Sequence, residues 1–225
     1  MTIKAIVTDI EGTTTSISFV FDVLFPYARK HIAGFVRSNP DHPDVQRELD
    51  AINREVGKPL STEQAIEQLI DWIDQDRKVT PLKSLQGMIW KQGYTDRQFT
   101  GHVYPDAAEY LHKWHDEGIK LYVYSSGSIA AQKLLFGHSD LGDLTPLFSG
   151  YFDTTIGMKQ ESSSYQRIAK ELAMDAGQIL FLSDSEEELD AAVDAGMRTA
   201  WLVRNQQQIT GSRHPRCHDF TEVPV

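Results

Sequence analysis

The chain has 225 residues, 40% of them hydrophobic and 24% charged, which predicts a globular protein of one or two domains. Its 22 basic and 32 acidic residues give a formal net charge of -10, which disfavours binding to nucleic acid and to anionic membranes. Because Cys217 has no second cysteine to pair with and no apolar run approaches the roughly 18 residues of a membrane span, we expect a cytoplasmic protein without a membrane partner.

The first element is the apolar run Ile3–Ile10, which is too short for a helix and predicts a strand buried on both faces. Residues 16–101 have a different pattern, in which apolar side chains recur at helical spacing. This spacing predicts three helices, around Val45–Val56, Ile66–Ile73 and Leu82–Ile89. Nothing in this stretch resembles a strand, so we expect a helical insertion after the first strand.

Two of these helices carry start signals. Ser61 or Thr62, with Glu63 close behind, is expected to cap the second helix. Thr80 and Pro81 are expected to be the N-cap and the first residue of the third helix, because proline is favoured at that position.

After residue 101 the pattern alternates between helix and strand. The predicted strands are Ile119–Tyr124, Phe148–Phe152, Ile179–Leu182 and Arg198–Val203. Helices are predicted between them, and the polar tail Asn205–Val225 is assigned to no element. Such alternation predicts an α/β fold with a doubly wound parallel sheet. We expect residues 1–15 and 102–225 to form this core and residues 16–101 to form a helical cap.

Ligands of such sheets bind at the carboxyl ends of the strands. The polar residues that directly follow the predicted strands should therefore meet there. They are Asp9 and Glu11 after the first strand, Ser125 and Ser126 after the second, Lys159 after the third and Asp184 after the fourth.

These residue types suit a phosphate ester and Mg²⁺. Asp9 and Asp184 provide the carboxylate oxygens that Mg²⁺ prefers, whereas without a cation clustered carboxylates repel one another. Ser126 and the amides after it can donate to a phosphate, and Lys159 offers it a positive charge. The carboxylate of Asp9 beside a metal could accept the phosphoryl group.

Each residue alone has an ordinary structural interpretation. Asp9 could cap a turn, the sequence SSGS could be a helix cap, and Lys159 could be a solvated surface charge. Glu187 and Glu188 are interpreted as helix-start acids that favour the positive end of the helix dipole. The equivalent positions at four strand ends favour a common site.

The motifs DIEGTT, YSSGS, GMKQESSSY and FLSDSEEELDAA, in this order, resemble the haloacid dehalogenase superfamily, and more narrowly the enolase-phosphatase family of methionine salvage. The superfamily's opening motif has two aspartates, and here the second acid is Glu11. The resemblance spans Ala5 to about Val203. The tail after Arg204 adds nothing to it.

The resemblance implies a monomeric, Mg²⁺-dependent acireductone synthase with one metal ion per subunit. Such an enzyme enolises 2,3-diketo-5-methylthiopentyl-1-phosphate and then removes the phosphate to give 1,2-dihydroxy-3-keto-5-methylthiopentene. By the resemblance, Asp9, Glu11 and Asp184 bind the metal, Asp9 is the nucleophile and Glu11 a general acid and base. Ser125, Ser126 and Lys159 bind the phosphate.

Two alternatives stay open from the sequence. One is a phosphatase of the same superfamily acting on another small phosphate ester. The other is a phospho-acceptor signalling domain, although such domains place the acceptor after the third strand and lack a helical insertion.

Overall fold

A computed structural model describes residues 2–204 and 213–225 and divides the chain into two compact units. One unit combines Met1–Ile17 with Thr100–Val225, and the other is Ser18–Phe99. The sequence placed the expected boundaries after residue 15 and after residue 101. No helix in the described part of the chain is both long and apolar enough to cross a membrane.

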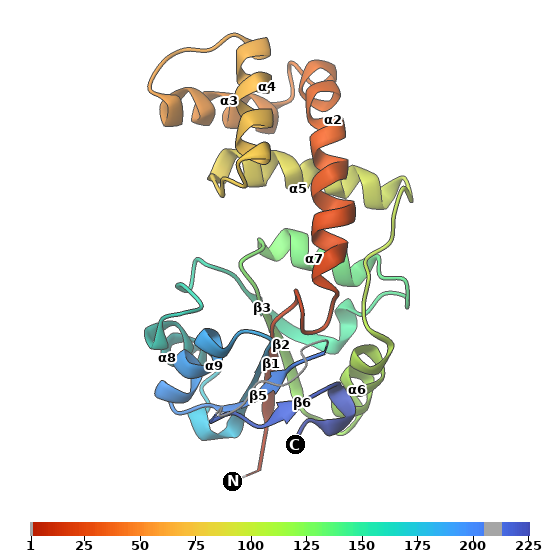
Figure 1. Ribbon diagram of the computed structural model, residues 1–225, viewed down its shortest axis with the longest axis vertical. Coiled ribbons are helices and arrows are strands. Elements are labelled where there is room, and N and C mark those ends of the chain that lie inside the picture. Colours follow the sequence, from red (N-terminus) through yellow and green to blue (C-terminus); the bar gives the residue numbers. More distant parts are fainter. Residues whose placement is uncertain (1, 205–212) are drawn as a thin grey trace. The chain divides into compact units, whose positions relative to one another are not determined.

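The first unit is built on a parallel sheet (Figure 1). In the described residues the sheet has six strands in the order β3-β2-β1-β4-β5-β6, and every neighbouring pair is parallel. The strands are β1 (Ala5–Thr8), β2 (Lys120–Tyr124), β3 (Phe148–Phe152), β4 (Ile179–Ser183), β5 (Arg198–Leu202) and β6 (Arg216–Cys217). This sheet confirms the predicted fold class.

The register of the sheet aligns the carboxyl ends of three strands. β1 lies between β2 and β4 and is buried along its whole length, as its unbroken apolar run predicts. Its last residue, Thr8, aligns with Val123 of β2 and Leu182 of β4. The residues that follow these strands therefore reach the same edge of the sheet.

Helices cover both faces of this sheet. In Figure 1, α8 and α9 lie on one side and α6 lies on the other. The helices of this unit are α6 (Pro105–Asp116), α7 (Ile129–Gly137), α8 (Ser162–Glu171) and α9 (Glu186–Asp194), with short 3₁₀ turns at Thr145–Leu147, Ala176–Gln178 and Phe220–Glu222. Tyr165 and Ile168 of α8 and Leu189 of α9 are fully buried against the strands, which fixes both helices on that face.

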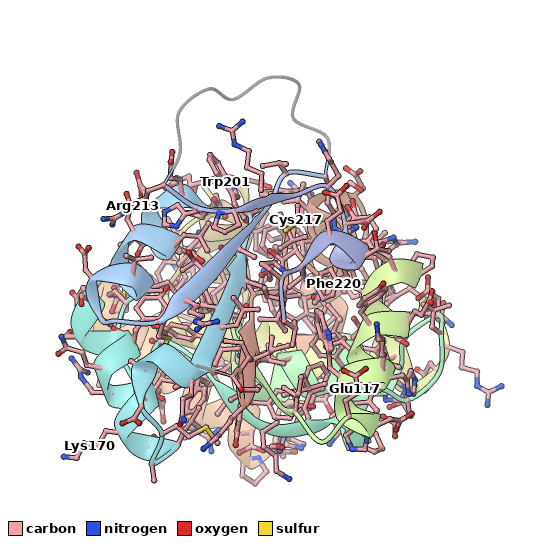
Figure 2. The ribbon with its side chains drawn as sticks, turned by 90° about the horizontal axis from the view of Figure 1, so that it is seen from below. Glu117, Lys170, Trp201, Arg213, Cys217 and Phe220 are labelled. Carbon is pink, nitrogen blue, oxygen red and sulfur yellow. The ribbon has the colours of Figure 1, made fainter. Side chains whose placement is uncertain are left out.

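The end of the chain, to which the sequence assigned no element, belongs to this core. Residues 205–212 of that tail lie outside the described residues. Beyond them β6 pairs with β5, and Phe220 is fully buried against Trp114 of α6, with ring centroids 5.5 Å apart. Figure 2 shows Cys217 close to the strand that carries Trp201, with Phe220 farther toward α6.

The second unit is entirely helical in the described residues. Its elements are α1 (Ile17–Phe19), the π-helix η1 (Val20–Leu24), α2 (Phe25–Ser38), α3 (Pro43–Val56), α4 (Thr62–Asp74) and α5 (Thr80–Thr95). The predicted apolar stripes form its core, with Val45, Ile52, Leu69 and Leu85 among the buried residues. No separate helix was predicted for residues 17–38. In this segment the carbonyl of Leu24 accepts a hydrogen bond from the indole of Trp90 at 2.8 Å.

The helix starts agree with the sequence in one case and not in the other. Ser61 caps α4 in a reciprocal capping box, although its partner is Gln64 rather than Glu63. The predicted N-cap of α5 was wrong, because Thr80 is already helical and Val79 is the extended residue before it. Pro81 is consequently the second helical residue, where its missing N–H is still harmless.

Candidate active site

Asp9 follows β1 and begins a tight turn. Its amide donates to the carbonyl of Leu182 at 2.9 Å, which extends the ladder between β1 and β4, and the residue is 4% exposed. One carbonyl, that of Ile10, then accepts three amide hydrogen bonds, from Thr13, Thr14 and Thr15. This turn holds the backbone of the Asp9–Glu11 motif close to the sheet.

Lys159 lies between two carboxylates at the strand ends. Its Nζ is 2.5 Å from Asp9 Oδ1 and 2.6 Å from Glu188 Oε2, and all three side chains are buried. Burial by itself lowers the pKa of Lys159, but the charges of Asp9 and Glu188 outweigh it, so its pKa lies above the ordinary value. Lys159 is therefore a charged bridge, and Tyr165 fixes its backbone by donating to its carbonyl at 2.7 Å.

Glu11 contacts the loop after β2. The hydroxyl of Ser125 donates to Glu11 Oε2 at 3.2 Å and accepts from the amide of Gly127 at 3.1 Å. Burial raises the pKa of Glu11, and the charge of Asp9 raises it further. A carboxyl group in this environment takes up a proton more readily than an exposed one.

Asp184 adds a further carboxyl group at the end of β4. Burial raises its pKa to about 7, with contributions from the charges of Asp9 and Glu188. Among the described residues of this cluster, four carboxyl groups therefore face one ammonium group. Such an excess of negative charge favours a cation, since otherwise some of these groups must protonate.

The loop after β2 is fixed by hydrogen bonds from the buried side chain of Gln132. Ser126 and Ser128 in this loop are exposed, and Ser128 caps α7 by accepting from the amide of Ala131. Gln132 is buried, and its Nε2 donates to the carbonyls of Gly127 at 2.8 Å and Phe152 at 2.9 Å. These bonds tie the loop to the end of β3.

The similarity of this chain to known proteins identifies its family. The model of the haloacid dehalogenase-like hydrolase family matches residues 3–196. The chain is 58% identical to enolase-phosphatase E1 of Pseudomonas aeruginosa (strain UCBPP-PA14) over the whole of both chains. It is 55% identical to enolase-phosphatase E1 of Alcanivorax borkumensis over 98% of each chain. The chain belongs to the enolase-phosphatase E1 family of haloacid dehalogenase-like hydrolases.

A solved structure agrees with this assignment. The crystal structure of UTR4 protein from Saccharomyces cerevisiae superposes with a TM-score of 0.83 at 31% identity, covering 98% of this chain and 100% of that one. The relatives from Pseudomonas and Alcanivorax confirm the resemblance to the enolase-phosphatase family of methionine salvage. Membership of this enzyme family removes the alternative of a signalling domain.

The structure brings most of the predicted site residues into contact. Asp9 pairs with Lys159 and Glu11 with Ser125, although 150 and 114 positions separate them in the sequence. Asp184 lies near enough to Asp9 for the two charges to interact, and Ser126 lies in the loop of Ser125.

Glu188 was missed by the sequence analysis. It was grouped with Glu187 as an ordinary helix-start acid, an interpretation that is wrong for Glu188 because its side chain is buried on Lys159 and accepts from Ser183 Oγ at 2.9 Å. Glu187 is exposed. No sequence signal separates Glu188 from Glu187, because both are acids in the first turn of α9.

Gly12 leaves no room for a side chain beside Asp184. A Cβ atom at this position would lie 2.0 Å from Asp184 Oδ2, and the backbone has φ = +78°. We expect Gly12→Ala to lower turnover by about 10-fold or more, because the displaced Asp184 carboxylate no longer faces the cluster. Phosphate release from the family's substrate measures the effect.

Gly57→Ala is the matched control for this change. Gly57 also has positive φ, at +75°, but a Cβ there meets nothing within 4 Å. Both variants carry the left-handed backbone penalty of about 1 kcal/mol, which urea unfolding measures. Equal turnover in the two variants would contradict the steric role of Gly12.

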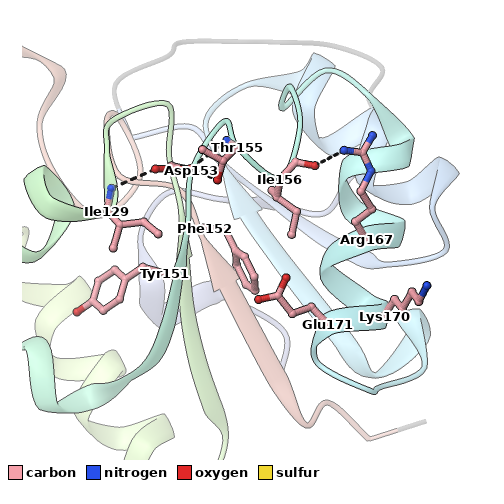
Figure 3. A pocket seen from close by; sticks show the side chains of 9 residues that line it. All are labelled: Ile129, Tyr151, Phe152, Asp153, Thr155, Ile156, Arg167, Lys170 and Glu171. Atoms are coloured by element: carbon pink, nitrogen blue, oxygen red, sulfur yellow. Dashed lines mark hydrogen bonds between the residues drawn. The ribbon is translucent and has the colours of Figure 1, made fainter. Parts of the chain in front are cut away.

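A separate pocket of ≈ 590 Å³ lies beside the end of β3 (Figure 3). Its lining includes Tyr151 and Asp153 near that strand end and Arg167 and Lys170 of α8. It contains none of the predicted site residues, and its charged side chains are of both signs. The clustered carboxylates and Lys159, not this pocket, form the candidate active site.

Proposed function

We propose that this chain enolises 2,3-diketo-5-methylthiopentyl-1-phosphate and then hydrolyses its phosphate ester, which yields 1,2-dihydroxy-3-keto-5-methylthiopentene. The name of the relatives supports the pair of activities. The observation that carries the proposal is the meeting of a carboxylate–lysine pair, Asp9 and Lys159, with a second acid, Glu11, at one edge of the sheet. One carboxyl group can transfer the phosphoryl group while the other moves a proton.

Asp9, Asp184 and Glu11 are the proposed ligands of one Mg²⁺ ion. The excess of buried carboxyl groups and the raised pKa of Asp184 fit a divalent cation with oxygen ligands. In the described residues no three acidic, histidine or cysteine side chains are grouped to hold a metal by themselves. Mg²⁺ retains waters and binds one or two carboxylates together with substrate phosphate, and Glu11 can contribute its carbonyl.

When bound, the metal supplies positive charge against the enolate and the transferring phosphoryl group. In the phosphatase step, a carboxylate oxygen of Asp9 forms a bond to phosphorus as the bond to the substrate oxygen breaks. Glu11 protonates that leaving oxygen. Water then attacks the aspartyl phosphate, giving its proton to Glu11, and releases inorganic phosphate.

The other polar residues bind and hold the phosphate. Lys159 is already charged and in contact with Asp9, so it can neutralise the phosphate at the moment of transfer. Ser125 and Ser126 can donate hydroxyl hydrogen bonds from the loop that Gln132 supports.

Glu11 is also the proposed base that removes the carbon-bound proton in enolisation. Its raised pKa makes it a stronger base than an exposed carboxylate. We expect Glu11→Gln to lower the rate of enol formation by about 10²- to 10⁴-fold, because the amide cannot accept this proton. The ultraviolet absorbance of the enol measures the rate, and Glu187→Gln, an exposed neighbour of the site, is the control. Enol formation at the wild-type rate would show that Glu11 is not the base.

The whole proposal is tested by incubating the protein with the diketone phosphate, with and without Mg²⁺. Enol absorbance and free phosphate are followed together. We expect both signals with Mg²⁺ and loss of both after chelation by EDTA. Phosphate release without enol absorbance would favour a phosphatase for another small phosphate ester.

We further propose that the enzyme is a cytoplasmic monomer that binds neither nucleic acid nor membranes. The single cysteine supports a reducing compartment, and the net charge of -10 supports the lack of anionic partners. Sedimentation equilibrium tests the monomer.

A further inference from the structure

A buried guanidinium group lies behind the turn that follows Asp9 and Glu11. Arg204 follows β5 after one intervening residue, Val203, and its side chain is 10% exposed. Its Nε donates to the carbonyl of Thr13 at 2.8 Å. Its Nη1 and Nη2 donate to the two carboxylate oxygens of Asp106 at 3.0 and 2.9 Å, and the group lies 3.7 Å from the ring centroid of Tyr104. Three of the donors of this planar fork thus have a partner that fixes their direction.

Asp106 extends the link to the end of the chain. Its Oδ2 also accepts from the amide of Phe220 at 3.0 Å, and Arg204 lies 5.4 Å from the ring centroid of Phe220. Burial raises the pKa of Asp106, but the hydrogen bonds from Arg204 and from Phe220 outweigh it and bring the pKa below the ordinary value. The pair is therefore ionised and well defined, rather than a loose surface contact.

The carbonyl of Thr13 differs from the other carbonyls of its turn. Those of Ile10, Thr14 and Thr15 accept backbone amides, from within the turn or, for Thr14, from Tyr104 at 2.9 Å. The carbonyl of Thr13 instead accepts from a side chain 191 positions away. Thr13 is fully buried, so removal of Arg204 leaves a carbonyl without this bond in a place that solvent does not reach.

We propose that Arg204 is a positioning residue for catalysis, which holds the Gly12–Thr15 turn and thereby the direction of Glu11 toward Ser125. Glu11 directly precedes this turn and pairs with Thr15 across it. A change in the turn thus shifts the acid that faces the substrate, together with its hydrogen bond to Ser125. The inference rests on the proposed function, since it assigns Glu11 a reacting proton.

The test compares Arg204→Ala, Arg204→Lys and Asp106→Asn in the full chain with Mg²⁺, at a temperature where circular dichroism shows each variant folded. Arg204→Ala should lower kcat for both enol formation and phosphate release by about 10- to 100-fold, with KM changed less than about threefold. Added guanidinium chloride at millimolar concentration should restore part of kcat, and methylammonium chloride should not. Arg204→Lys should stay well below wild type, because an ammonium group cannot reach all three acceptors together.

Asp106→Asn distinguishes the positioning of Glu11 by Arg204 from a purely structural role of the ion pair between Arg204 and Asp106. This change removes the charge of the pair but leaves the Nε of Arg204 free to donate to Thr13, so we expect a smaller loss of kcat than in Arg204→Lys. Equal losses of kcat in the two variants would overturn the inference, as would wild-type kcat in Arg204→Ala. If Arg204→Ala does not fold, the comparison of Arg204→Lys with Asp106→Asn decides alone. If the wild-type protein forms neither enol nor phosphate, the proposed function itself fails.

Discussion

Asp9→Asn is expected to lower the rate of phosphate release by on the order of 10⁴-fold, because its amide cannot form the bond to phosphorus. Asparagine has nearly the same shape, so the buried position beside Lys159 stays filled. Steady-state release of inorganic phosphate measures the loss. Acid quenching of wild-type protein with a radiolabelled phosphate ester should also trap label on the chain, and the variant should trap none.

Asp190→Asn is the control for this change. Asp190 lies on α9, where it forms an ion pair with Arg213 and a hydrogen bond with His214. Its variant should release phosphate at close to the wild-type rate. Near-normal phosphate release by Asp9→Asn would refute the nucleophile assignment.

Lys159→Met is expected to lower the free energy of unfolding by about 3–5 kcal/mol in EDTA at neutral pH. The substitution leaves the buried carboxylates of Asp9 and Glu188 without the ammonium group that lies between them. Urea unfolding followed by circular dichroism measures the change. Turnover should also fall, since the charge that faces the phosphate is lost.

Two further variants test the cause. Adding Glu188→Gln to Lys159→Met removes one of the uncompensated charges and should recover part of the lost stability. Lys170→Met removes an exposed lysine of α8 and should change stability by less than about 0.5 kcal/mol. An unfolding free energy of Lys159→Met equal to that of Lys170→Met would show that the buried bridge contributes nothing.

The parts of the fold that were predictable are those that depend on local pattern. β1 and β4 are short, unbroken apolar runs, which is the pattern of a strand buried on both faces. Parallel strands of one sheet end at the same edge, and this rule brings Asp9 and Lys159 together. The rule places strand ends whatever their separation in the sequence, and the loop after β3 then carries Lys159 to Asp9. It therefore worked over a separation of 150 positions.

The parts that were missed depend on tertiary contacts. Glu188 is an acid in the first turn of a helix, where acids are common for local reasons, so only its burial shows its role. Arg204 follows a strand in the same way as many surface residues do, and its partners Thr13 and Asp106 are far away in the sequence. The helices of residues 17–38 include a π-helix, whose spacing departs from the usual helical period.

The central place of β1 in the sheet governs the order in which the protein can form during synthesis. β1 leaves the ribosome before its partners β2 and β4, which begin only at Lys120 and Ile179. The whole helical unit, Ser18–Phe99, with its own apolar core, is made in between. The proposed nucleophile therefore follows an apolar strand that has no partner strand while the helical unit is synthesised, and an unpaired apolar strand of this kind needs protection from aggregation.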